Sequence, residues 1–566
     1  MKKVLSFTLC IAIVMTLALS AFALAAVAVK GIQLDKSAIS LEVGKSYPLI
    51  VTLTPANTTQ KLLKYSTSDK NIATIDNSGK ITAVKAGKAV ITVASASNSK
   101  ILAKCTVTAI VKPKVKLSFC LSQTGWGGEA VDPELMKAVE KTIEDKTSTD
   151  LEVIAPPQSS YNDKINVMLS SGQIPDIYAI RKAMDTVQVM AARGYTMVLD
   201  NLINDFPTIT SQVDKLYFEN LKVNGKLMAV PMYVPLSKVI WLRKDMAEKY
   251  GVSLSETPTT DQFYTEMKKL AGKGFIPFTF AKFLDNLPFF FNPFGAYYGI
   301  GYKDGKFFDG FNTPGAKEAL AYAAKLYKDK IWDPEFLTNE NAGMREKLAS
   351  GKAASDLDYF NRYIYYASES VKINAATDFQ PIYELKGPKG IGGNLNEAIQ
   401  DALAISPNCK NPDRALEVIQ YYVYTDEGVM LRNIGVKGQH YTIENGVIKP
   451  VAKATNSGYK CDVNGFFLYF PKITDFGFKW DETTEKLLPN QLKVNTEITK
   501  HLGPKYLVPG GISDIYDKNL PAYKKKIDEI SAKLITGADS VFNGYEEYQR
   551  FWNSINGNEM LKQLNK

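Results

Sequence analysis

LSSGQIPDIYAI, residues 169–180, marks the point where a helix gives way to a strand. Upstream of it, apolar residues recur at helical spacing (Tyr161, Ile165, Met168, Leu169), and Gly172 is suited to end that helix. Pro175 and Asp176 then precede the apolar run IYAI, which is too short for a helix and typical of a buried strand. The stretch therefore predicts a helix followed by a strand.

Two more strands are predicted upstream, VKLSFCLS (115–122) and DLEVIA (150–155). Between them, Asp132 and Pro133 suit the N-cap and the first position of a helix whose apolar face is Leu135, Val139 and Ile143. The order strand, helix, strand, helix, strand predicts a parallel sheet with helices on both faces.

The position of Asp176 indicates its role. In open α/β sheets, ligands bind beyond the carboxyl ends of the strands. Asp176 lies at the amino end of its strand, so we predict a structural carboxylate that accepts hydrogen bonds from nearby backbone or loop groups. Arg181 and Lys182 follow the strand and lie at the ligand end.

The N-terminus is typical of an export signal. Lys2 and Lys3 precede a long apolar stretch, and the small residues Ala23 and Ala25 suit cleavage, which predicts a signal peptide over 1–25. An uncleaved anchor is the alternative. Cys10 lies inside the apolar stretch, so we expect no lipid attachment there. No later stretch is long and apolar enough to span a membrane, so we predict an exported protein.

Composition narrows the class of protein. The 566 residues are 45% hydrophobic and 22% charged, which is ordinary for a soluble chain of two to four domains. The formal charge of +9 comes from 68 basic and 59 acidic residues, and we interpret the charged residues as spread along the chain without a dense block. A nucleic-acid binder would concentrate basic residues in a patch, so no such partner is predicted. The excess is interpreted as mild surface polarity, suited to an anionic cell wall.

Residues 30–112 are predicted to be all-β, because short Val/Ile/Thr-rich runs such as GKITAV and GKAVITVAS alternate with turns such as DNSG. The order GIQLDKSAISLEVGKSYPLIVTLTPANTT, then YSTSDKNIATIDNSGKITAVKAGKAVITV, resembles the bacterial immunoglobulin-like domain of group two. Tyr65 stands where that family usually has Trp. The resemblance implies a spacer, with an adhesive domain as the alternative.

From about residue 114 onward, the chain resembles the extracellular solute-binding proteins, family one, of bacterial ABC importers, and especially their long carbohydrate-binding Gram-positive branch. The motifs are LSSGQIPDIYAI, GYTMVLDNLINDFP, VNGKLMAVPMYV with VIWLRKDMAEKYGV, FNTPGAKEALAYAAKLYKDKIWDPEF, SGKAAS and CKNPDRALEVIQYYVYTDEGVMLRNIGVKGQHYTIENG. Local signals agree with it: Asn224 and Gly225 suit a hairpin, and Thr313-Pro314 and Asn411-Pro412 suit helix starts.

The resemblance implies a multidomain chain: an all-β Ig-like sandwich, then a two-lobed α/β periplasmic-binding-protein-like fold of type II over 114–566. We expect one lobe at roughly 114–233 with 405–470 and the other at 234–404 with 471–566. The chain then crosses between lobes near 231–236 and 404–407, and again further on. The implied function is capture of a carbohydrate, expected to be an oligosaccharide, by hinge closure, followed by delivery to the transmembrane subunits of an ABC permease.

Aromatic rings that pack on sugar faces, with polar groups beside them, are the expected ligand contacts. Trp126, among glycines past the first strand, is the leading stacking residue, and Gln123 is its hydroxyl-binding neighbour. Tyr233, in the first crossing, either binds ligand or plugs the hinge. The resemblance adds Asp358, Tyr359 and Arg362 along the cleft and Trp480 closing from the second lobe. Arg181, Lys182 and Arg362 leave an acidic sugar open, whereas Trp241 and Trp332 are predicted to be packing residues.

Catalytic and metal signatures are missing from the sequence, which has two histidines, His440 and His501, and neither an HExxH nor a GxSxG motif. We predict no enzyme activity, no metal site and no cofactor, with a carbohydrate-active enzyme using Asp356 and Asp358 as the minor alternative. Another alternative is a surface adhesion or wall-binding protein. Of Cys105, Cys120, Cys409 and Cys461, the first two are predicted to be small buried side chains. We expect a monomer at the cell surface, with wall association through the Ig-like domain.

Overall fold

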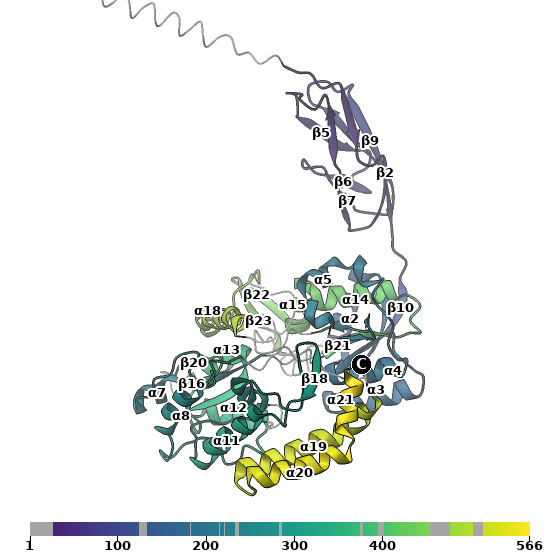
Figure 1. The fold of residues 1–566 in the computed structure, drawn as a ribbon. Coiled ribbons are helices and arrows are strands. Elements are labelled where there is room, and N and C mark those ends of the chain that lie inside the picture. Colours follow the sequence, from purple (N-terminus) through teal and green to yellow (C-terminus); the bar gives the residue numbers. More distant parts are fainter. Residues whose placement is uncertain are drawn as a thin grey trace, which may run out of the picture. The chain divides into compact units, whose positions relative to one another are not determined.

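The computed structural model describes residues 26–123, 133–181, 183–213, 215–219, 221–232, 237–281, 286–373, 377–393, 401–452, 476–501 and 513–565. The chain divides into two compact units, Met1–Lys114 and Val115–Lys566 (Figure 1). No helix among the described residues is long and apolar enough to cross a bilayer.

The first unit is the predicted β-sandwich. One sheet has the order β2-β9-β8-β5, a second has the order β3-β7-β6, and β1 pairs with β4. Its strands are β1 (Gly31–Leu34), β2 (Ala38–Glu42), β3 (Ser46–Pro48), β4 (Val51–Thr54), β5 (Leu63–Thr67), β6 (Ala73–Ile75), β7 (Lys80–Ala83), β8 (Gly87–Ser95) and β9 (Leu102–Ile110).

The sandwich has its own core. In β8 and β9, every second residue is buried, and Ile91, Val93, Cys105 and Val107 form the core together with Ile81 of β7. This alternation is expected for a sheet with one face in the core and the other exposed to solvent. Tyr65 packs against the edge of this core, half-buried, which is compatible with its expected role as a core aromatic.

The second unit begins with a five-stranded sheet of order β11-β10-β12-β21-β15. Its strands are β10 (Val115–Cys120), β11 (Thr149–Ile154), β12 (Ile177–Arg181), β15 (Val230–Pro231) and β21 (Asp401–Ile405). The pairs β10–β11 and β10–β12 are parallel, as predicted, but β21 runs antiparallel to both β12 and β15. The three strands of the predicted order are therefore parallel, and β21, a strand that returns from the rest of the chain, adds an antiparallel neighbour that the prediction did not cover.

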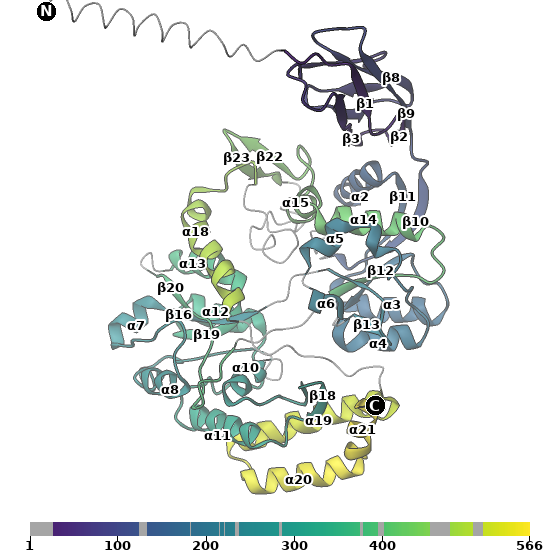
Figure 2. The ribbon, with the colours of Figure 1, turned by 45° about the horizontal axis from the view of Figure 1, so that its top comes forward.

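Helices cover both faces of this sheet (Figure 2). Phe119 contacts Tyr422 of α14 on one face, while the Tyr161 hydroxyl of α3 donates to the Ala179 carbonyl. The helices of this lobe are α2 (Pro133–Thr147), α3 (Tyr161–Ser170), α4 (Ala183–Ala192), α5 (Pro207–Gln212), α6 (Lys215–Glu219) and α14 (Pro412–Tyr424). Asn224 and Gly225, both at positive φ, form the predicted turn between β13 (Lys222–Val223) and β14 (Lys226–Leu227).

The second lobe has a three-stranded antiparallel sheet of order β19-β16-β20, formed by β16 (Lys238–Arg243), β19 (Ser355–Tyr359) and β20 (Phe379–Ile382). The surrounding elements are α7 (Lys244–Tyr250), α8 (Thr260–Lys268), α10 (Pro288–Phe291), β17 (Ile300–Lys303), β18 (Lys306–Asp309), α11 (Pro314–Lys328), α12 (Asn341–Ala349) and α13 (Tyr363–Val371). After residue 476 follow α18 (Glu482–Glu497), α19 (Asp514–Thr536), α20 (Val541–Ser554) and α21 (Gly557–Leu564). Helices α19 and α20 lie side by side (Figures 1 and 2).

Aromatic residues dominate the core of this lobe. Phe278 and Phe280 contact Phe290, and Trp332 packs on Phe280 with ring centroids 4.8 Å apart. Trp241 and Trp332 are 0% and 2% exposed, which confirms that they are packing residues. The aromatic run at 289–291 is buried in this core.

Two details differ from the expected division into lobes. The strand β21 begins at Asp401 in the first sheet, so residues 401–404 belong with the first lobe and not with the second. The segment after α15 (Asp426–Ile434) also differs. In the hairpin of β22 (Tyr441–Glu444) and β23 (Val447–Pro450), Tyr441 and Ile448 share a core with Val239 and Tyr363 of the second lobe. The apolar face of this hairpin is buried there, whereas the prediction assigned it to the first lobe. The rest of the predicted division stays a prediction.

The two predicted buried cysteines, Cys105 and Cys120, are free and fully buried. Burial raises the pKa of the Cys120 thiol to about 11, so this side chain stays protonated at neutral pH. Cys409 is also free and buried. Cys10 and Cys461 lie outside the described residues.

Asp176 has the structural role that its position in the sequence predicts. Its Oδ2 accepts hydrogen bonds from the backbone N–H of Ser118 at 2.8 Å and from the Ser118 hydroxyl at 2.9 Å. Its backbone carbonyl accepts from the N–H of Ser406 at 2.9 Å. Asp176 thus ties β10 to the end of β21.

We predict that Asp176→Ala lowers the unfolding free energy of the second unit by about 2 kcal/mol, because the Ser118 N–H loses its acceptor. Asp150→Ala, at an exposed carboxylate of β11, should change it by less than about 0.5 kcal/mol. Urea unfolding followed by tryptophan fluorescence measures both, since all 5 Trp residues follow residue 115. Equal effects of the two substitutions would contradict the assignment.

Candidate ligand-binding site

The candidate site on the first lobe is the sheet edge where β10 and β12 end. Cys120 pairs with Tyr178, so Gln123 follows β10 at the level of Arg181, the last residue of β12. Arg181 pairs with Asp401, whose Oδ2 lies 3.9 Å from the arginine Nε. The structure therefore brings Gln123 and Arg181 to one edge, together with Asp401, which the sequence analysis did not identify.

The same edge is where the chain leaves for the second lobe and where it returns. The outgoing strand β15 pairs with β21, and the N–H of Met232 donates to the Asp401 carbonyl at 2.9 Å. Only the residues 233–236 separate Met232 from Ser237 at the start of the second sheet. A chain of that length spans at most about 18 Å, so the two sheet edges are covalently held near one another.

The matching edge of the second lobe is formed by the start of β16 and the end of β19. Lys238 pairs with Tyr359, its Nζ lies 5.0 Å from the centre of the Tyr359 ring, and it donates to Oδ1 of Asn286 at 2.7 Å. Tyr359 is half-buried, so part of this ring faces solvent. Lys238 was missed because a lysine at the start of an apolar strand is usually exposed, whereas this one is 5% exposed.

Asp358 is placed differently from the other predicted contacts. It is 2% exposed, and Arg345 donates to both of its oxygens, at 2.7 and 3.0 Å. The Tyr359 N–H and the Tyr366 hydroxyl also donate to it, each at 2.8 Å. Both oxygens are fully occupied, which argues against direct ligand contact. Asp358 instead holds the end of β19 that carries Tyr359.

Asp356, two residues earlier on β19, completes this buried cluster. It is 0% exposed, and one of its oxygens lies 2.5 Å from the Tyr366 hydroxyl. Burial, and then repulsion by Asp358, raises the pKa of Asp356 well above its ordinary value. Burial also pushes the pKa of Asp358 upward, but hydrogen bonds and charge from Arg345 outweigh it, so that pKa is lowered. Asp356 is therefore protonated and Asp358 ionised.

The remaining predicted residues differ in their surroundings. Trp126, Tyr233 and Lys182 lie outside the described residues. Arg362 follows β19 in partial burial, and its Nε has no hydrogen-bond partner in the part of the chain that the structure describes. Trp480 is 4% exposed and packs edge-on against Phe476 and Phe478. This packing argues against direct stacking of a ligand on the Trp480 ring in the present conformation.

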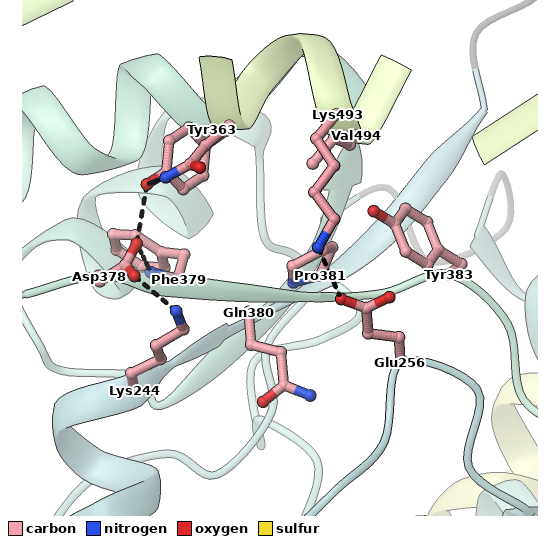
Figure 3. A pocket seen from close by; sticks show the side chains of 11 residues that line it. Lys244, Glu256, Tyr363, Asp378, Phe379, Gln380, Pro381, Tyr383, Lys493 and Val494 are labelled. Carbon is pink, nitrogen blue, oxygen red and sulfur yellow. Dashed lines mark hydrogen bonds and ion pairs between the residues drawn. The ribbon is translucent and has the colours of Figure 1, made fainter. Parts of the chain in front are cut away.

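A separate pocket lies along β20, the opposite edge strand of the second sheet from β19 (Figure 3). Its charged side chains pair with one another: Lys244 with Asp378 at 2.6 Å, and Lys493 with Glu256 at 3.7 Å. The Tyr363 hydroxyl donates to Asp378 as well, at 2.8 Å. These groups hold α18 and α7 near β20.

Both histidines make local contacts with described residues. The Val436 N–H donates to Nδ1 of His440, and His501 lies 3.0 Å from Glu384 and stacks on Tyr383. Among the described residues, no group of three or more His, Cys, Asp or Glu could hold a metal ion.

These features define a two-lobed α/β protein whose lobes are joined by neighbouring strands, following a β-sandwich. Residues 128–428 match the bacterial extracellular solute-binding proteins, and the chain belongs to this family. Residues 28–111 match the bacterial Ig-like domain, group 2.

Three similar proteins illustrate the range of the family. Lipoprotein LipO of Bacillus subtilis is 24% identical over 450 residues, which cover 75% of this chain and 88% of LipO. The polygalacturonan/rhamnogalacturonan-binding protein YtcQ of the same organism is 27% identical over 267 residues, covering 44% of this chain and 52% of YtcQ. The N-glycan transport solute-binding protein NgtS of Streptococcus pneumoniae, solved in complex with Man1GlcNAc, superposes with a TM-score of 0.52 at 18% identity, covering 80% of this chain and 99% of NgtS.

We predict that Asp358→Asn lowers the unfolding free energy by about 3 kcal/mol, because Arg345 is left without a buried counter-charge. Asp356→Asn should change it by less than about 1 kcal/mol below about pH 4, where this carboxyl is uncharged in both the folded and the unfolded chain, and should raise it at neutral pH. Chemical denaturation of the two matched variants measures both effects.

The pH dependence provides a control. The raised pKa of Asp356 means that the folded chain holds its proton more tightly than the unfolded chain, whose value is near 3.8. This contribution to stability is complete at low pH and is lost as the pH rises above about 4 toward the folded-state pKa. Asp356→Asn should remove this decline. An unchanged decline in that variant would contradict the protonated state.

Proposed function

We propose that the chain is the solute-binding component of an ABC importer and that it captures a carbohydrate, an oligosaccharide, between its two lobes. Membership of the solute-binding family carries this proposal. The names of two relatives support the ligand class, because one binds N-glycan and the other polygalacturonan and rhamnogalacturonan.

The geometry of the candidate site agrees with such a ligand. An apolar ring face with polar edges recognises a sugar, which has C–H faces and peripheral hydroxyls. Tyr359 supplies a half-buried ring on one lobe, while Gln123 and Arg181 supply polar groups on the other. Closure about the crossing segments buries the sugar between them. The loaded protein then presents the sugar to the transmembrane subunits of the permease.

The protein acts without catalysis in this proposal. A glycosidase needs two carboxyl groups that flank the scissile bond with room for a sugar between them. Asp356 and Asp358 instead bond to the same Tyr366 hydroxyl, and both are fully enclosed. No substrate can enter between them without unfolding the strand end.

We further propose that the protein works outside the cell as a monomer and is retained at the wall by its Ig-like unit. The export signal supports the first part. The second part answers a functional need, because a binding protein that delivers to a membrane permease must stay near the cell. Adhesion alone is the alternative function, in which the second unit would bind no sugar.

We expect calorimetric titration of the folded chain against a panel of neutral and acidic oligosaccharides to reveal binding without product release. Tyr359→Ala should weaken the affinity for the bound sugar by about tenfold or more, since a stacking ring contributes about 1.4 kcal/mol or more. Tyr302→Ala, which removes a half-buried ring of β17, is the matched control and should leave affinity unchanged. No binding across the panel, or release of reducing sugar, would contradict the proposal.

A further inference from the structure

The positive charge of the chain is concentrated in one unit. Residues 26–114 contain 13 Lys against 4 Asp and Glu, a formal charge of +9. Residues 115–566 contain 53 basic and 55 acidic residues and are close to neutral. The Ig-like unit therefore carries the entire excess of the exported chain. The lysines are spaced along strands and form no dense block in the sequence, so their concentration in one unit becomes visible only when the charge is counted unit by unit.

The few acidic groups of this unit are engaged in its own structure. Asp35 accepts from the Tyr47 hydroxyl at 2.6 Å and from the Ile50 N–H at 3.0 Å. Asp76 closes a turn by accepting from Ser78 and Lys80, and Asp69 accepts from the Asn71 N–H. Glu42 pairs with Lys112. None of these groups forms an ion pair with Lys64, Lys88 or Lys104.

The lysines, in contrast, face solvent. All of residues 26–114 are described, and every lysine among them except Lys112 is exposed. Apart from Lys112 and Lys114, none of them forms an ion pair or a side-chain hydrogen bond with another described residue. A surface with this many uncompensated cations has a positive potential that attracts polyanions.

One face of the unit collects three lysines, and Glu42, the acidic residue at the end of β2 on that face, pairs with Lys112. In the sheet β2-β9-β8-β5, Lys64 lies on β5, Lys88 on β8 and Lys104 on β9, all on the solvent side. The register places Thr92 opposite both Ser66 and Lys104, and Thr108 opposite Lys88. Adjacent strands are about 4.8 Å apart, and Lys64 is opposite Ala94, two residues along β8 from Thr92, so Lys64 and Lys104 stand about 12 Å apart. Hydroxyl and small side chains fill the intervals.

We propose that this sheet face binds a flexible linear polyanion, a polymer with repeating phosphate or carboxylate groups. The inference rests on the proposed retention at the wall and names the class of ligand responsible for it. The lysines of this face are spaced along three neighbouring strands and do not surround one point, an arrangement that suits a polymer better than a compact anion. A flexible polymer can place successive anions against such an array, and small hydroxyl side chains leave its backbone room to approach.

Charge complementarity favours the polymer over a lipid surface. Exposed large apolar residues lie at both ends of the sheet, Leu62 and Leu102 at one end and Ile110 and Val111 at the other, whereas the lysines lie along its length between them. Lys88 is four residues along β8 from Thr92, which is opposite Lys104. Lys88 and Lys104 are therefore about 13 Å apart in the direction of the strands. An array of that length suits an extended chain of anions.

The test uses residues 26–566 and fluorescently labelled linear polyphosphate as the probe, measured by anisotropy at 50 and 500 mM salt. Binding should weaken at least about a hundredfold at the higher salt, because screening shortens the reach of surface charges. Replacing Lys64, Lys88 and Lys104 together by Gln should weaken binding at low salt at least tenfold. Replacing the same three by Arg, which keeps the positive charge, should change the low-salt affinity by less than about twofold. This variant separates loss of charge from loss of the fold.

A matched control removes the same charge elsewhere. Lys226, Lys273 and Lys306 of the second unit are exposed, and their joint replacement by Gln should change affinity less than twofold. Equal losses from the two Gln variants would overturn the assignment to the sheet face. Absence of polyphosphate binding, or tighter binding to vesicles of 30% phosphatidylglycerol in phosphatidylcholine, would overturn the choice of ligand.

A cellular arm separates this inference from the proposed retention. Deleting residues 30–112 should release the protein from cells into the medium, and the triple Lys→Gln variant should be released in the same way. If deletion releases the protein but the triple variant stays bound, the polyanion inference fails while retention stands. If deletion leaves surface retention unchanged, the proposed retention and the inference built on it both fail.

Discussion

The pairing of β21 between β12 and β15 is the constraint on which the second unit depends. The outgoing chain leaves the first sheet through β15, and the returning chain joins it at Asp401, hydrogen-bonded to the strand beside it. Two neighbouring antiparallel strands thus connect the lobes at one edge. Backbone torsions outside the strands can change at little cost, whereas the paired strands themselves are held by their ladder. This connection permits rotation of one lobe on the other while it keeps the Gln123 and Arg181 edge close to the crossing segments.

Buried charge stabilises the facing edge. Lys238, Asp358 and the protonated Asp356 are almost fully removed from water, Arg345 is partly buried beside them, and each charge has a polar partner. Removing one member leaves the other charge without compensation, so the end of β19 has one favoured arrangement. Tyr359 follows directly, and its ring is oriented by this rigid support and by the Lys238 cation. A ring fixed before the ligand arrives loses less conformational entropy on binding.

The sequence predicted those parts of the fold that depend on local signals. Gly172 at a helix end, the Asn224-Gly225 turn, the Thr313 N-cap and the hydrogen-bonding role of Asp176 follow from short-range chemistry, and the structure confirms them. The direction of β21 depends on pairing with a strand far away in the chain and was not predictable from its own residues. In the same way, alternation along β19 predicted that Asp356 and Asp358 share a face, but Arg345 and Tyr366 come from α12 and α13. The burial of Trp480 depends on Phe476 and Phe478, whose packing no local spacing indicates.

The distance between the lobes tests the account most directly. Spin labels at Asn166→Cys on α3 and Glu248→Cys on α7, both exposed positions on different lobes, report that distance by pulsed electron resonance, with Cys461→Ser added and the buried native thiols retained. On addition of a bound oligosaccharide, the distance distribution should narrow and move to shorter values, and Tyr359→Ala should require more sugar for the same shift. A distribution that is unchanged at saturating sugar would contradict capture by closure of two hinged lobes.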